Sequence, residues 1–147
     1  MNKTVSTILY EKDFYAWTLH NAELLRQGKI RDIDAINIAE ELESIGKSDR
    51  RQVINRLIVL LVHLLKWEYQ KESRSGSWKG SIVEQRRRVI RLLEDSPSLN
   101  IELDKKLDYA YTEALKQASI ETGLDRSLFP IRCPYSKEQI LNDEFYP

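Results

Sequence analysis

The strongest constraint on the fold of this chain is an apolar run at residues 57–65. Eight of its nine side chains are apolar, and His63 is the exception. A helix that spans a membrane needs about 20 such residues, and basic residues bracket this run on both sides. On a helical wheel, the apolar side chains of residues 53–67 cover about half of the circumference. We therefore expect a central helix that other helices surround.

Helical patterns recur along the rest of the chain, and no segment has the pattern of a strand. Gly28, Gly46 and Gly123 stand where helices are expected to end, Ser81 with Glu84 predicts a capping box, and Pro97 suits a first helical position. Residues 73–80 form the one internal loop that we expect to be flexible. The expected helices are residues 13–27, from 32 or 34 to 46, from 48 or 49 onward, from 81 to 94 or 95, and 97–122.

These patterns predict an all-α fold, a single-domain bundle of about five helices. A chain of 147 residues suits one domain. We expect residues 1–10 to form an N-terminal extension. We also expect residues 124–147 to form an irregular tail that packs across the bundle, with a short helix that begins near Ser136.

Composition excludes several classes of protein. Cys133 is the only cysteine, so no internal disulfide forms, and the first residues lack the apolar stretch of a signal peptide. We therefore expect a cytoplasmic protein, and neither a secreted disulfide-rich protein nor a membrane protein.

Charge is balanced overall but segregated along the chain, with 23 basic and 23 acidic side chains. Residues 1–46 carry a net charge of −3, residues 47–91 carry +8 and residues 92–147 carry −5. The simplest interpretation is that acidic and basic helices lie side by side and pair their charges. The alternative is that residues 47–91 bind an acidic partner or the phosphate groups of a nucleic acid, with Tyr69 and Trp78 near enough to stack on bases.

No common catalytic or metal-binding motif occurs. The chain has two histidines, and it lacks the spacings typical of zinc sites, di-iron bundles and phosphate-binding loops. No cofactor is therefore identified, and a divalent metal is the one cofactor left to consider.

A diffuse set of polar residues remains. Glu40, Glu41 and Glu43 cluster on the second expected helix, while Arg56, His63 and Lys66 share a stripe of the central helix. If these helices pack together, the carboxylates meet His63 inside the bundle. The simplest interpretation is a structural polar network. The alternatives are acid–base catalysis by His63, Glu40, Glu43 and Lys66, or a metal site held by His63, Glu40 and Glu43.

Several segments, in this order, resemble the domain-of-unknown-function family numbered twenty-nine. They are Glu40-Glu41-Leu42-Glu43 with Gly46, His63-Leu64-Leu65-Lys66-Trp67, Ser77-Trp78, Glu84-Gln85-Arg86, Ser96-Pro97-Ser98-Leu99, Glu121-Thr122-Gly123-Leu124, Phe129-Pro130 and Cys133-Pro134-Tyr135. The resemblance implies one helical domain from a set of small bacterial proteins, and it implies no activity or cofactor. Together with the wheels it favours a shared pocket or polar network that includes Glu41, Arg56, Trp78, Glu84, Gln85 and Arg86.

The function that we expect first is an interaction or regulatory protein that acts through protein contacts, as a homodimer or with a partner protein. The second hypothesis is a metal-dependent or acid–base enzyme that uses the glutamate and histidine cluster. Nucleic-acid binding by residues 47–91 is the third.

Overall fold

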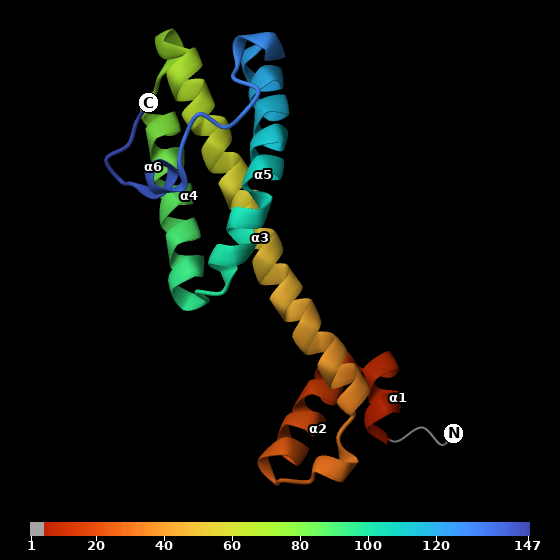
Figure 1. The fold of residues 1–147 in the computed structure, drawn as a ribbon. Helices are drawn as coiled ribbons and strands as arrows, with labels where there is room; N and C mark the ends of the chain where they lie inside the picture. The colour runs from red at the N-terminus through yellow and green to blue at the C-terminus, as the bar shows by residue number, and fades with distance from the viewer. Residues whose placement is uncertain (1–4) are drawn as a thin grey trace. The chain divides into compact units, whose positions relative to one another are not determined.

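The computed structural model describes residues 5–147, and within that range it contains six α-helices and no strand. The prediction of an all-α fold is therefore confirmed. Contacts group the chain into two compact units, of which the first ends at Lys47 and the second runs from Ser48 to Pro147. The helices in Figure 1 are α1 Val5–Lys12, α2 Phe14–Arg26, α3 Ala35–Tyr69, α4 Gly76–Asp95, α5 Leu99–Thr122 and α6 Lys137–Leu141.

The first unit consists of α1, α2 and residues 35–47 of α3. A buried hydrogen-bond network joins α2 to the start of α3. The indole Nε1 of Trp17 donates to the Asp34 carboxylate at 3.0 Å, and the Asp34 backbone N–H donates to the Asn21 side-chain oxygen at 2.9 Å. Asp34 also receives a hydrogen bond from the Asn37 side chain at 2.7 Å. The expected N-terminal extension is thus helical from Val5 onward, while residues 1–4 lie outside the described range.

The helix α3 is one continuous helix of 35 residues that contributes to both units. The prediction that Gly46 ends a helix is wrong. Gly28 and Gly123 have φ angles of 71° and 72°, the left-handed conformation that ends a helix, whereas Gly46 stays helical. A glycine inside a helix lowers the stability of the helix by about 1 kcal/mol relative to alanine. The other residues of a long helix can offset this loss.

The start of α4 also differs from the prediction. Ser75 caps this helix by accepting a hydrogen bond from the Trp78 backbone N–H, so Ser81 and Glu84 lie in its interior and do not form a capping box. The expected flexible loop is instead a short turn followed by the first turn of α4. Similarly, α5 begins at Leu99, so Pro97 lies just before the helix.

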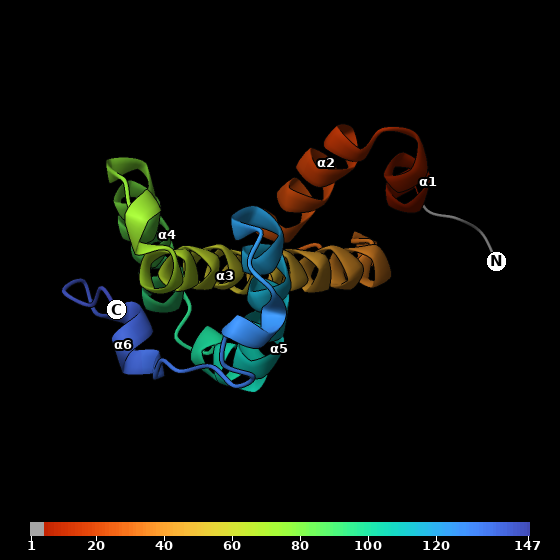
Figure 2. The same ribbon diagram turned by 90° about the horizontal axis from the view of Figure 1, so that it is seen from above.

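The core of the second unit forms where α4 and α5 lie along the later part of α3 (Figures 1 and 2). Leu57, Leu61 and Leu64 are fully buried there, as the apolar run predicts. The tail packs on this core through Phe129, Tyr135 and Ile140, and α6 begins with the capping box that Ser136 and Gln139 form. The prediction of a tail packed on the bundle is confirmed.

Among the helices of the described range, none is both long and apolar enough to cross a membrane. That all 147 residues form one domain stays a prediction.

Candidate functional site

The predicted meeting of Glu40 and Glu43 with His63 does not occur. It required two separate helices packed side by side, but both segments belong to α3. Side chains on one helix are neighbours only at spacings of three or four residues. Glu40 and Glu43 are exposed instead. Glu41 accepts a hydrogen bond from the Tyr10 hydroxyl at 2.6 Å, within the first unit.

No group of three or more histidine, cysteine, aspartate or glutamate side chains within residues 5–147 is placed to hold a metal ion. His63, Glu40 and Glu43 in particular are not brought together as the metal hypothesis requires.

His63 lines a groove of about 520 Å³ between α3 and α5. Its Nδ1 lies 2.9 Å from the Val59 carbonyl oxygen, which can only accept, so in the neutral ring Nδ1 carries the proton and Nε2 is left as an acceptor. Glu113, Glu121 and Tyr109 of α5 line the same groove. Glu40 and Glu43, the carboxylates expected beside His63, do not line this groove, and catalysis by His63 stays a prediction.

Arg86 lines a groove of about 440 Å³ together with Asp143, and its guanidinium binds the tail. Its side chain is fully buried, and the guanidinium donates to the backbone carbonyls of Ile140, Asp143 and Phe145 at 2.8, 3.4 and 2.8 Å. Burial lowers the pKa of Arg86. This side chain therefore fastens the C-terminal segment to α4.

Lys66 and Trp78 are brought together as an α3–α4 pair. The Lys66 ammonium lies 4.6 Å from the centre of the Trp78 ring, a distance typical of a cation–π contact. Trp78 lies in the first turn of α4 and is half-buried. The pair joins the two helices at the surface.

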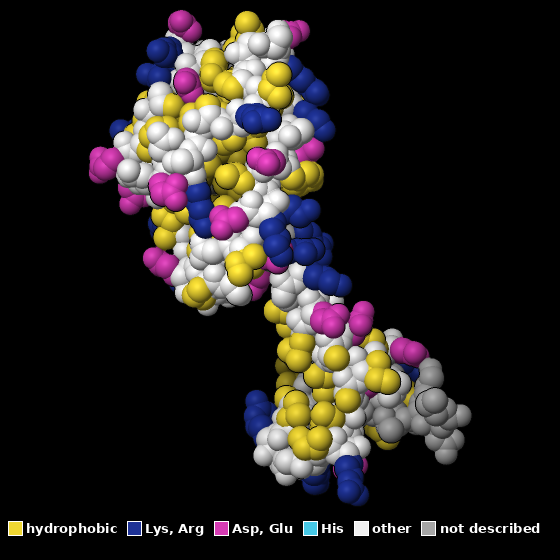
Figure 3. Space-filling view, in the orientation of Figure 1, with side chains coloured by type: hydrophobic (Ala, Val, Ile, Leu, Met, Phe, Trp, Pro, Cys, Tyr) yellow, Lys and Arg dark blue, Asp and Glu magenta, His cyan; other side chains and the backbone are white. Residues whose placement is uncertain are grey.

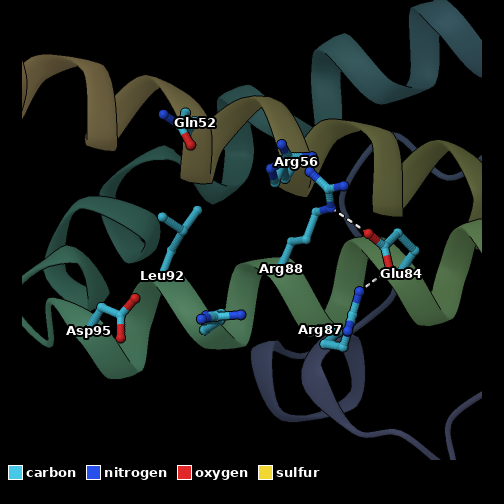
Figure 4. A pocket seen from close by; sticks show the side chains of 8 residues that line it. Gln52, Arg56, Glu84, Arg87, Arg88, Leu92 and Asp95 are labelled. Carbon is cyan, nitrogen blue, oxygen red and sulfur yellow. Dashed lines mark hydrogen bonds and ion pairs between the residues drawn. The ribbon is translucent and has the colours of Figure 1, made fainter.

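A groove of about 390 Å³ between α3 and α4, which we call the arginine groove, gathers several of the predicted polar residues. Figure 4 shows the Arg88 side chain extending from α4 toward α3 and ending near Arg56. The Gln85 side chain accepts a hydrogen bond from Arg56 at 3.3 Å. The groove is lined by Gln52, Arg56, Glu84, Arg87, Arg88, Arg91, Leu92 and Asp95.

Glu84 orders two of these arginines. Its carboxylate oxygens accept hydrogen bonds from Arg87 at 2.6 Å and from Arg88 at 2.5 Å. The hydrogen bonds from Arg88 and Arg87 lower the pKa of Glu84. Because each guanidinium has five N–H donors, both arginines keep most of their donors for other partners.

The first unit contains a second groove, of about 430 Å³, which we call the apolar groove. One wall is α2 and the other is the start of α3. Figure 3 shows hydrophobic side chains gathered on the surface of these elements. The groove is lined by Phe14, Trp17, Thr18, Asn21, Ala22, Leu25, Ile38, Glu41, Leu42 and Ile45.

The sequence pattern did not distinguish this groove from a core. Ile38, Leu42 and Ile45 have the spacing of a buried helix face, but Leu42 and Ile45 are 63% and 60% exposed. The sequence showed Arg88 and Arg91 only as part of a basic run. It could not place them in one groove with Arg56, because that depends on which faces of α3 and α4 meet. Spacing on α4 was the available signal, since residues 84, 88, 91 and 95 share one face.

Of three comparisons with known proteins, one identifies the family of the chain. No curated protein and no solved structure matches the chain. The family model described as domain of unknown function DUF29 matches residues 9–146, which is nearly the whole chain. The segments that resembled that family thus occur in one continuous match, and the chain belongs to the DUF29 family.

Proposed function

We propose that this protein acts through protein contacts and forms a homodimer, in which the apolar groove of the first unit is the interface. The observation that carries the proposal is the imbalance between exposed and buried side chains in this unit. Ten large hydrophobic side chains between residues 5 and 47 are exposed, and Trp17 is the one that is buried in that range.

The first unit ends at Lys47, and even a domain of about 60 residues buries only about 60% of its unfolded surface and is marginally stable. The first unit contains no cysteine. Contiguous apolar patches rimmed by polar residues are typical of protein-binding sites. An apolar partner surface in the groove would remove Leu42, Ile45 and Phe14 from water.

The charges around the groove favour a second copy as the partner. Glu41 is the one charged residue among the lining residues, and its carboxylate is already hydrogen-bonded to Tyr10. On the wheel of α3, Glu40 and Glu43 lie on the side opposite Ile38, Leu42 and Ile45. Two copies can therefore bring the same patch together about a two-fold axis without opposing like charges.

The test is the mass of the protein in solution, measured by light scattering after gel filtration at micromolar concentration. We expect the wild-type chain to have twice the mass of one chain. Leu42→Glu and Ile45→Glu should be monomeric with an unchanged far-ultraviolet circular dichroism spectrum, because both side chains are exposed in one chain and glutamate is a good helix former.

Ile131→Glu is the matched control, because Ile131 is 94% exposed in the second unit and lies outside the groove. It should leave the dimer intact. A wild-type chain that is monomeric at every concentration overturns the proposal, and so does a dimer that survives both groove substitutions.

A further inference from the structure

The arginine groove has a composition that the dimer does not explain. Arg56 comes from α3, and Arg87, Arg88 and Arg91 come from α4. Two carboxylates, Glu84 and Asp95, line the same groove, so the lining carries a net charge of +2. Within the described residues, no carboxylate forms an ion pair with Arg56 or Arg91.

Three of the four arginines are held in place by hydrogen bonds before any ligand arrives. Glu84 binds the Nε of Arg88 and an Nη of Arg87, and Gln85 receives a hydrogen bond from Arg56. Figure 4 shows Arg88 reaching from α4 toward α3, so that its guanidinium and that of Arg56 face the same space. Two like charges side by side repel one another, and an anion between them removes that repulsion.

The direction of the donors indicates the shape of the ligand. A carboxylate offers two oxygens in one plane, which suits one guanidinium fork. Here the forks come from two helices, so an anion with acceptors in several directions uses more of them. A tetrahedral phosphate provides such acceptors. A volume of about 390 Å³ lies in the range of small-molecule sites.

The same geometry disfavours a long nucleic acid as the ligand. The basic run of α4 does not form one continuous surface, because Arg86 is fully buried and donates to tail carbonyls, whereas Arg87 and Arg88 reach solvent. Glu84 and Asp95 also lie on the face of α4 that carries Arg88, where they would oppose a phosphate backbone.

We propose that the arginine groove binds a small phosphate-bearing anion of two or more negative charges, with Arg56 and Arg88 donating to its oxygens from opposite sides. Arg91 adds positive charge at the same face of α4, and Glu84 acts as a positioning residue that keeps Arg88 extended into the groove.

Isothermal titration calorimetry of the full chain with sodium pyrophosphate, in a phosphate-free buffer of low ionic strength, tests the proposal. We expect one site per chain, with an affinity that falls as sodium chloride is added. Arg56→Gln and Arg88→Gln should each weaken binding about tenfold or more, because each removes charge-assisted hydrogen bonds.

Arg51→Gln is the matched control. Arg51 is an exposed arginine on the same helix as Arg56, but it does not line the groove. It should change the affinity by less than about threefold, which corresponds to screened long-range charge alone. Arg56→Lys keeps the charge but loses the guanidinium fork, so we expect affinity between those of wild type and Arg56→Gln.

Three results overturn the proposal. One is the absence of any heat of binding with pyrophosphate at low ionic strength. The second is an equal loss of affinity in Arg51→Gln and Arg56→Gln. The third is binding of a single-stranded oligonucleotide without binding of pyrophosphate, which would identify the basic segment as a nucleic-acid surface. Neither of the first two results affects the dimer, which is measured by mass.

Discussion

Arg86 shows how one side chain can fix a segment that has little regular structure. Its three hydrogen bonds reach carbonyls over six residues of the tail, and its ring contact with Tyr146 measures 5.6 Å from guanidinium to ring centre. A buried arginine is costly to dehydrate unless its donors are satisfied. The tail supplies those acceptors, so Arg86 and the tail require each other.

Arg86→Met tests this dependence. Methionine fills much of the same volume but donates no hydrogen bonds, so the carbonyls of Ile140, Asp143 and Phe145 lose their shared partner. We expect the free energy of unfolding to fall by about 3 kcal/mol in urea titrations followed by circular dichroism. The neighbouring exposed residue serves as the control, and Arg87→Met should cost less than about 1 kcal/mol. Equal losses would contradict the assigned role.

Glu84 provides a prediction on pH. The hydrogen bonds from Arg88 and Arg87 lower the pKa of Glu84, so its carboxylate stays charged below the usual range. The stabilisation from these pairs is present above the ordinary pKa of a glutamate and is lost as pH falls through the lowered value. Carbon NMR of the labelled carboxyl should show this low titration, and Arg88→Gln should move the pKa of Glu84 upward. An unchanged pKa in Arg88→Gln would contradict the pairing.

At the scale of elements, α3 is the helix on which both units are built, and Gly46 lies in its interior. The position of Gly46 is open, since a Cβ added there would meet no atom within 4 Å. Gly46 therefore destabilises the helix only through the backbone entropy that glycine loses on folding. Gly123 also has open space, but its φ of 72° is strained for any other residue.

These two glycines should respond in opposite ways to the same substitution. Gly46→Ala should raise the free energy of unfolding by roughly 0.5–1 kcal/mol, because alanine has less freedom in the unfolded chain and fits the helix. Gly123→Ala should lower it by about 1–2 kcal/mol. Thermal or urea unfolding of both variants measures the difference, and a loss of stability in Gly46→Ala would show that the helix is not continuous there in solution.

The same elements show how far the sequence can be interpreted. Helix ends at Gly28, Asp95 and Gly123 agree with local signals, because capping depends on residues close in sequence. Gly46 and the Ser81–Glu84 pair carried similar signals, yet the helices continue through both. A capping motif allows a helix to end but does not require it, and whether the helix ends there depends on how the flanking segments pack.

The grooves could be predicted less well than the helices for a related reason. The set that included Arg56, Glu84 and Gln85 does gather between α3 and α4. Glu40, Glu41 and Glu43 of the first unit do not line this groove. They were predicted to lie near His63 on the assumption that α3 was two helices packed side by side. Helical periodicity shows that a face is apolar or charged, but not which face of another helix, or of another chain, will cover it.

At the scale of the molecule, the two units differ in how well they bury their apolar residues. The second unit has a contiguous core in which α3, α4, α5 and the tail all take part. The first unit relies on Trp17 and the polar network around Asp34. A second copy on the apolar groove would add to the first unit the apolar contacts that its own residues do not supply.

This difference predicts a stability that depends on concentration. If the apolar groove joins two chains, the melting temperature of the wild-type protein should rise with protein concentration by mass action. The melting temperature of Leu42→Glu should stay constant over the same range. Differential scanning calorimetry at several concentrations measures both. A constant wild-type melting temperature would contradict the dimer, whatever its absolute value.

The way in which Arg86 binds the tail has a consequence for proteases. A protease cleaves a segment that it can draw into an extended conformation in its active site, and irregular exposed segments are usually cut first. Residues 142–144 are irregular and exposed, but carbonyls before, within and just after this stretch are hydrogen-bonded to a buried guanidinium. Thermolysin cleaves before large apolar residues such as Phe145, and it should therefore spare this stretch in the folded protein. Because all three of these hydrogen bonds end on main-chain carbonyls, they do not require a particular side chain at residues 142–144.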